Sequence, residues 1–137
     1  AFYPRHFQAL HQGVPELLGS LRNHDIPQII LSSGYQAALE RDLFRFHIAD
    51  YFDAVLGAND TLASGKVQRG LDWLATQSIA PEDMVLIGDT LHDFETAQAM
   101  GVPCILCAIG HQSQADLLSA GVPVVDAFSQ PSPLLLP

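Results

Sequence analysis

Residues 84–110, MVLIGDTLHDFETAQAMGVPCILCAIG, contain the pattern that decides the fold. A short apolar run ends in Asp89, a polar turn follows, and residues 92–101 have the spacing of a helix. Gly101 closes that helix, because glycine readily adopts the left-handed conformation that often ends one. A second apolar run then begins at residue 102. Apolar runs without polar alternation are typical of strands buried on both faces, so the stretch predicts two parallel strands joined by a helix.

The same alternation extends along most of the chain. Outside this stretch, helical spacing covers residues 14–25, 35–48, 65–78 and 112–121, and short strand-like runs cover 26–34, 51–58 and 122–128. With strands at 82–89 and 102–110, this predicts an α/β, Rossmann-like parallel sheet of about five strands with flanking helices. We expect residues 14–128 to form this core, residues 1–13 to lead into it, and residues 129–137 to form a Pro-rich tail.

The composition excludes several classes of partner. The 137 residues carry a formal net charge of −9 and only six Lys and Arg, whereas nucleic-acid binding depends on clusters of these cations. No apolar run approaches the roughly 18 residues of a membrane span, and no signal peptide is recognisable. We therefore expect a cytoplasmic protein that binds neither nucleic acid nor membrane. A negative chain that handles an anionic substrate would need a bridging cation.

Two cysteines, Cys104 and Cys107, form a C-x-x-C sequence inside the predicted strand 102–110. This spacing occurs in redox pairs and in one half of some metal sites. Residues three apart on a strand face opposite sides, however, and the chain has no second cysteine pair. We interpret both as small apolar residues of a buried strand.

Polar residues that suit an anion follow the first two predicted strands. In a parallel sheet, ligands bind at the carboxyl ends of the strands. The first strand ends in Ser32, Ser33 and Gly34, whose hydroxyl and N–H groups would form an anion cradle at a strand-to-helix turn. The alternative is a serine that caps the next helix. After the second strand, Lys66 lies at the start of the helix predicted for residues 65–78. The helix dipole disfavours a cation there, so Lys66 has either an anionic partner or a solvated surface position.

Two carboxylates lie at the end of the third strand. Asp89 ends the apolar run and Asp93 follows in the first helical turn, so both can point into one crevice. Such oxygen ligands suit Mg²⁺, which takes few protein carboxylates and keeps several waters. Asp93 could instead be an early-helix acid that favours the dipole, whereas a carboxylate that ends an apolar strand needs a partner. Together the strand ends predict a site for a phosphate group and a divalent cation.

These residues and their order resemble the haloacid dehalogenase (HAD) superfamily, and most closely its phosphoglycolate-phosphatase-like branch. The segment IILSS is similar to the family's second motif, with Ser32, and SGKVQRGLDWL to its third, with Lys66. The segment GDTLHD is similar to the fourth motif, with Asp89 and Asp93. The similarity covers roughly residues 12–127. It implies a HAD-like fold for the predicted sheet.

The resemblance also implies a reaction and a role for each residue. In the family an aspartate attacks phosphorus, and water hydrolyses the resulting aspartyl-phosphate. Ser32 would hydrogen-bond the transferring phosphoryl group, and Lys66 would offset charge on that group and on the nucleophile. Asp89 would bind Mg²⁺, with Asp93 as a ligand or a partner of the metal's waters. The substrate would be a small phosphorylated metabolite.

One family motif, D-x-D-G-T, is absent, because no two aspartates in this chain lie two positions apart. That motif carries the nucleophile and the general acid/base, and it ends the central strand of the family's sheet. The resemblance therefore implies a carboxyl-terminal portion from which the central nucleophile strand and the substrate-selecting cap are absent. Residues 1–13 would be the exit from that cap. Such a chain is expected to be inactive by itself.

The absent strand would leave a slot between the strands that end at Ser32 and Asp89. Exposed apolar strand edges would favour strand exchange or self-association. Alternatively, a separate amino-terminal segment fills the slot, or the two flanking strands close directly. Two other functions also stay open: a phosphomutase such as β-phosphoglucomutase, and a non-catalytic α/β module that binds phosphate or a partner protein.

Overall fold

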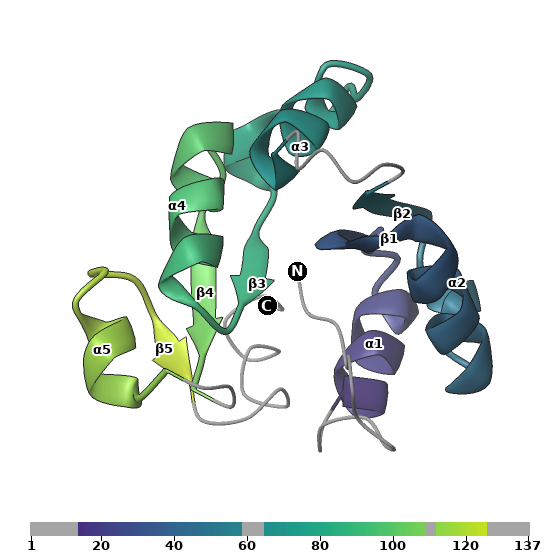
Figure 1. The fold of residues 1–137 in the computed structure, drawn as a ribbon, viewed down its shortest axis with the longest axis horizontal. Coiled ribbons are helices and arrows are strands. Elements are labelled where there is room, and N and C mark those ends of the chain that lie inside the picture. Colours follow the sequence, from purple (N-terminus) through teal and green to yellow (C-terminus); the bar gives the residue numbers. More distant parts are fainter. Residues whose placement is uncertain (1–13, 59–64, 109–111, 126–137) are drawn as a thin grey trace.

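The structure, a computed structural model, describes residues 14–58, 65–108 and 112–125. The predicted lead-in at 1–13 and the Pro-rich tail at 129–137 lie outside these residues. Helices alternate with strands as predicted, and every strand pair is parallel (Figure 1). The α/β, Rossmann-like class is therefore confirmed.

All five predicted helices and five predicted strands are present, most of them shorter than expected. The helices are α1 (Val14–Asn23), α2 (Gln36–Arg45), α3 (Lys66–Leu74), α4 (Leu91–Met100) and α5 (Gln114–Leu118), with short 3-10 helices η1 (Ala49–Tyr51) and η2 (Pro81–Asp83). The strands are β1 (Ile29–Tyr35), β2 (Ala54–Ala58), β3 (Leu86–Gly88), β4 (Cys104–Cys107) and β5 (Val124–Val125). Among the described residues, none of the helices has the length and apolar character that a membrane crossing requires.

The end of β1 differs from the prediction. Ser32, Ser33 and Gly34 lie within the strand, which continues to Tyr35, and α2 begins at the next residue. The strand end therefore lies one residue beyond the predicted one. The regular pairing of β1 with β2 is nevertheless interrupted between Leu31 and Tyr35.

The five strands form two sheets where the sequence predicted one. β1 pairs with β2, and β3, β4 and β5 pair in that order. Within the described parts of the chain, β1 and β3 are edge strands that are not hydrogen-bonded to each other. Direct closure of the two flanking strands is therefore not what the structure shows. The separation falls between the strands that lead to Ser32 and Asp89, which is where the sequence placed the absent strand.

An apolar cavity of about 650 Å³ lies between the two sheets. Its lining includes Ile29 and Leu31 from β1, Leu86 from β3, and Trp73 and Met100 from α3 and α4. Side chains from both sheets thus face the same apolar space. Strand exchange and self-association stay predictions, which sedimentation velocity on the chain would test.

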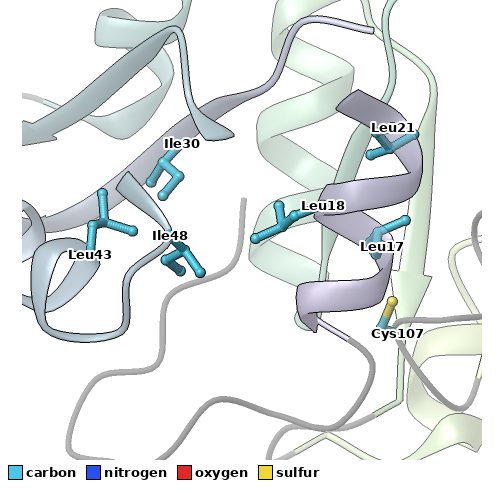
Figure 2. Packing of buried hydrophobic residues seen from close by; sticks show 7 residues of the cluster. All are labelled: Leu17, Leu18, Leu21, Ile30, Leu43, Ile48 and Cys107. Carbon is cyan, nitrogen blue, oxygen red and sulfur yellow. The ribbon is translucent and has the colours of Figure 1, made fainter. Parts of the chain in front are cut away.

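Helix α1 joins the two halves of the molecule through its apolar face. Leu17 and Leu18 are each 1% exposed and belong to a cluster that includes Ile30 of β1 and Cys107 of β4. Figure 2 shows Leu17 on the side of α1 towards Cys107, and Leu18 pointing towards Ile48. Burying one such leucine stabilises a fold by roughly 1.5–3 kcal/mol. A second cluster packs α4 and α5 against β3 and β4 (Leu86, Ala97, Val102, Cys104, Leu106 and Leu117).

Candidate functional site

Asp93 is a buried carboxylate whose two oxygens accept different hydrogen bonds. Lys66 Nζ lies 2.5 Å from Oδ1, and the two side chains are 10% and 5% exposed. Oδ2 accepts from Asp89 N (3.0 Å), Thr90 N (3.3 Å) and Thr90 Oγ1 (3.1 Å). Thr90 Oγ1 in turn accepts from Asp93 N, which completes a capping box at the start of α4. Asp93 thus fixes the turn between β3 and α4 and holds Lys66 at the same time.

The glycine before Asp89 is explained by the closeness of Asp93. A Cβ added at Gly88 would lie 2.4 Å from Asp93 Cβ and 2.5 Å from its Oδ2. Real side chains do not approach so closely, so only glycine lets the strand end lie against this carboxylate. The Gly-Asp pair that the sequence singled out therefore reflects a steric requirement of the Asp93 position.

The Lys66 ammonium has the anionic partner that its unfavourable place at a helix start suggested. Burial by itself would raise the pKa of Asp93. Nearby positive charge, including that of Lys66, and hydrogen bonds from Lys66 and the Asp89 backbone outweigh burial and lower this pKa to about 2. The Asp93 carboxylate is therefore ionised at neutral pH.

Asp89 lies in a different electrostatic environment. It follows β3 directly and is half-buried, and no Lys or Arg among the described residues forms a salt bridge with it. Its burial, followed by the negative charge of Asp93, raises the pKa of Asp89 above its usual value. An ionised carboxylate in this position is stabilised by a cation.

The described residues fit a Mg²⁺ ion that is held by few protein ligands. They contain no cluster of three or more His, Cys, Asp or Glu that could hold a metal. In the described part of the chain no lysine or arginine forms an ion pair with Asp89, which suits a direct ligand. Asp93 already accepts four side-chain or backbone donors, which is about the capacity of a carboxylate. Mg²⁺ commonly keeps several waters, so one carboxylate and an oriented neighbour suffice for its protein side.

Ser32 is buried, and its two oxygens have different partners. Its Oγ accepts a 3.0 Å hydrogen bond from Gly34 N, and its carbonyl oxygen accepts a 2.6 Å bond from Arg69 Nη2. The hydroxyl hydrogen of Ser32 is thus available for donation to an anion, because the bond from Gly34 uses only a lone pair. Ser33 is exposed.

Helix α3 brings these residues into one arrangement. Lys66 and Arg69 are three residues apart, so their side chains lie on the same side of the helix. Lys66 contacts Asp93, and Arg69 contacts the Ser32 backbone. The contacts therefore connect Ser32 with the carboxylates through a single helical turn. The metal and phosphate roles of the individual residues stay predictions.

Three residues at this site were missed from the sequence. Arg69 contacts Ser32 across 37 positions, and no local pattern indicates such a pair. Gln112 Oε1 accepts from Leu91 N at 2.5 Å and thereby satisfies a donor at the start of α4. Thr90, in the polar turn after Asp89, caps α4, and a helix-capping residue three positions before an acid is a signal that the sequence does carry.

The C-x-x-C pair lies apart from this chemistry. Cys104 and Cys107 are free, buried thiols of β4. Burial raises the pKa of Cys104 to about 11 and that of Cys107 to about 12. Thiols of this kind are unreactive, because the thiolate is the reactive form. Their interpretation as residues of a buried strand is confirmed.

The fold and the strand-end residues define a Rossmann-like α/β protein with an acidic site beside a buried lysine. The model of the haloacid dehalogenase-like hydrolase family matches residues 4–107, and the chain belongs to this family. The tyrosine-protein kinase PtkA of Mycobacterium tuberculosis is 29% identical over 111 residues, which are 80% of this chain and 38% of the kinase.

Two further comparisons agree with this assignment. A phosphoglycolate phosphatase of Photorhabdus laumondii is 28% identical over 96 residues, or 69% of this chain and 41% of the phosphatase. The structure of a haloacid dehalogenase-like hydrolase from Streptococcus pneumoniae superposes with a TM-score of 0.83 at 23% identity, covering 93% of this chain and 60% of that chain. The chain thus spans less than half the length of the curated relatives described here.

Proposed function

We propose that this chain supplies the phosphate- and metal-binding part of a Mg²⁺-dependent phosphomonoester hydrolase. The observation that supports this proposal most strongly is the connection made by α3. Through Lys66 and Arg69, this helix links the Ser32 segment to Asp93 and, through the Asp93 carboxylate, to Asp89. Membership of the haloacid dehalogenase-like hydrolase family agrees with the proposal.

The charges explain why a metal belongs to the proposed site. Asp93 balances the Lys66 ammonium, so a phosphate dianion that approaches Lys66 also meets the negative charge of Asp89. Mg²⁺, when bound, would supply the positive charge that offsets this repulsion and stabilises charge on the transferring group. Asp89 would hold the ion directly, and Asp93 would orient a bound water and keep Lys66 extended. Ser32 would donate its hydroxyl hydrogen to a phosphoryl oxygen.

We propose that the longer protein acts through an aspartyl-phosphate, with a nucleophile from a segment outside this chain. Asp93 is a poor nucleophile in this arrangement, because its oxygens are engaged by four donors. Asp89 is assigned to the metal. The chain by itself is therefore expected to bind phosphate and Mg²⁺ without turning over substrate.

Hydrolysis of p-nitrophenyl phosphate tests this function. The chain alone, the full reading frame and its Asp89→Asn variant are compared with and without Mg²⁺. We expect activity only from the full reading frame with metal, and loss of at least a hundredfold in the variant, because metal assistance contributes several kcal/mol. Asp72→Asn, at an exposed carboxylate of α3, is the matched control. Full activity of Asp89→Asn would disprove the proposal.

The same residues would also serve transfer to an acceptor other than water. The relative named as a tyrosine-protein kinase supports this second possibility. In a phosphomutase, too, the acceptor would be a hydroxyl group other than water. The acceptor distinguishes the three reactions. If labelled phosphate from a phosphomonoester appears as inorganic phosphate whether or not tyrosine or sugar hydroxyls are supplied, the protein is a phosphatase. Transfer to the added hydroxyl would favour the alternative.

A further inference from the structure

The segment that would receive phosphate is an irregular part of β1. Regular pairing with β2 covers Ile29 to Leu31 and resumes only at Tyr35. Between these points the backbone finds partners outside the ladder. Gly34 N donates to Ser32 Oγ, and the Ser32 carbonyl accepts from a side chain of α3. Such a segment depends on those side chains for its conformation, because strand pairing does not hold it.

Arg69 of α3 supports this segment from another element, because its side chain reaches the Ser32 backbone. Its Nη2 lies 2.6 Å from the Ser32 carbonyl oxygen. A hydrogen bond of this length with a charged donor is among the stronger ones in proteins. Arg69 is half-buried and lines a hollow together with residues of β2 and α3. The contact therefore ties the end of β1 to α3.

The same turn of α3 is packed against the other half of the molecule. Lys66, one turn before Arg69, is held by Asp93. A Cβ added at Gly70 would lie 2.5 Å from Met100 Sδ of α4 and 3.2 Å from Leu31 Cδ2 of β1. One helical turn thus contacts β1 of one sheet and α4, the helix that packs on the other sheet, and strand pairing does not join these two sheets in the described chain. The position of Ser32 relative to Lys66 is set through this turn.

We infer that Arg69 is a positioning residue that holds the irregular Ser32–Gly34 segment at a fixed position relative to Lys66. It thereby couples the phosphate side of the site to the metal side. The effect on phosphate binding rests on the proposed function, whereas the contact of Arg69 with the Ser32 backbone does not. Donation to the Ser32 carbonyl also polarises the peptide group that it shares with Ser33 N–H, which strengthens that N–H as a donor. Arg69 acts through the backbone and does not itself contact the phosphate.

Amide hydrogen exchange tests the geometric part. In Arg69→Met, which keeps the aliphatic stem, we expect the Gly34 amide to exchange about tenfold faster, since the loss of one charged hydrogen bond corresponds to about this factor. The Leu106 amide, which donates to Pro123 in the other sheet, serves as the internal reference and should not change. Gln68→Met is the matched control, because Gln68 is exposed and contacts Asp72 of its own helix. An unchanged Gly34 rate in Arg69→Met overturns the inference.

Phosphate titration tests the functional part. Inorganic phosphate with Mg²⁺ is added to the wild-type chain, Arg69→Met and Arg69→Lys, and the Ser33 and Gly34 amide shifts are followed. We expect affinity to fall about tenfold in Arg69→Met, with partial recovery in Arg69→Lys, which keeps the charge but not the planar fork. Gln68→Met should bind as the wild type does.

The two measurements separate this inference from the proposed function. If the wild-type chain shows no phosphate shifts, the proposed phosphate site fails, while the exchange rates still decide whether Arg69 holds the segment. If exchange rises in Arg69→Met but phosphate affinity does not change, Arg69 is structural only and its role in the site is overturned. A faster Gly34 amide together with weaker phosphate binding, at an unchanged Leu106 rate, is the expected result.

Discussion

Lys66 Nζ and Asp93 Oδ1 lie 2.5 Å apart although the two residues are 27 positions apart in the chain. Both side chains are largely buried, at 10% and 5% exposure. The pair joins the first residue of α3 to the first turn of α4, and Asp93 also fixes the turn that carries Asp89. The spatial relation between the candidate phosphate and metal ligands thus depends on one ion pair.

Removal of the Lys66 charge should lower the free energy of unfolding. Lys66→Met would leave Asp93 charged, buried and without its cation, and breaking such pairs costs about 3–5 kcal/mol. The double variant Lys66→Met/Asp93→Asn should be less destabilised than Lys66→Met alone, because asparagine removes the charge and keeps an oxygen that caps α4. Urea unfolding measures all the variants, with Glu95→Gln on the exposed face of α4 as the control. Additive effects of the two substitutions would contradict this account.

Acid should remove the stabilisation that ionised Asp93 contributes. Its pKa is lowered from 3.8 to about 2 in the folded state, so the contribution is present above the unfolded value and is lost as the pH falls from about 4 through 2. A shift of this size corresponds to at most about 2 kcal/mol. Urea unfolding of the wild type and Asp93→Asn between pH 6 and pH 2 provides the measurement. The stability difference between the two should shrink on acidification; a constant difference would rule out this linkage.

Mg²⁺ should stabilise the chain through Asp89. The raised pKa of this carboxylate means that its ionised form opposes folding above its usual pKa, and a bound cation would relieve this effect. At a Mg²⁺ concentration tenfold above the dissociation constant, the gain is about 1.4 kcal/mol. Thermal unfolding with and without Mg²⁺ should show this gain in the wild type and none in Asp89→Asn. The variant should be at least as stable as the wild type without metal.

Two glycines offer a matched pair of alanine substitutions. Gly88→Ala would bring a methyl group within 2.4 Å of Asp93 Cβ, which forces Asp93 away from Lys66. Gly19 lies within α1 with open space around the added Cβ, so Gly19→Ala should stabilise the chain by about 0.5–1 kcal/mol. We expect a loss of several kcal/mol for Gly88→Ala, comparable with overpacking elsewhere. Chemical denaturation measures the change in the free energy of unfolding for each variant. Similar changes at the two positions would refute the steric argument.

The two cysteines should resist modification in the folded protein. Their pKa values of about 11 and 12 keep Cys104 and Cys107 as thiols at neutral pH, and both are buried. Iodoacetamide at pH 7.5 should therefore label neither in buffer and both in 8 M urea, as mass spectrometry would show. Rapid native labelling of either one would revive the redox interpretation of the C-x-x-C sequence.

The sequence alone determined the succession of helices and strands, because short apolar runs and helical spacing are local properties. It also located the start of α3 at Lys66 and the end of α4 at Gly101, whose φ of 75° is the left-handed value that glycine favours. Asp89 and Asp93 could be singled out because carboxylates beside an apolar strand are rarely left without partners.

The tertiary structure alone decided how these pieces meet. The division into two sheets, the contact of Arg69 with Ser32 and the pairing of Lys66 with Asp93 all join residues far apart in the chain. No periodicity encodes such contacts, since they depend on how helices pack over the sheets. For the same reason Asp93, which the sequence offered either as a metal ligand or as an early-helix acid, is in the folded chain a helix-capping carboxylate and the partner of a buried lysine.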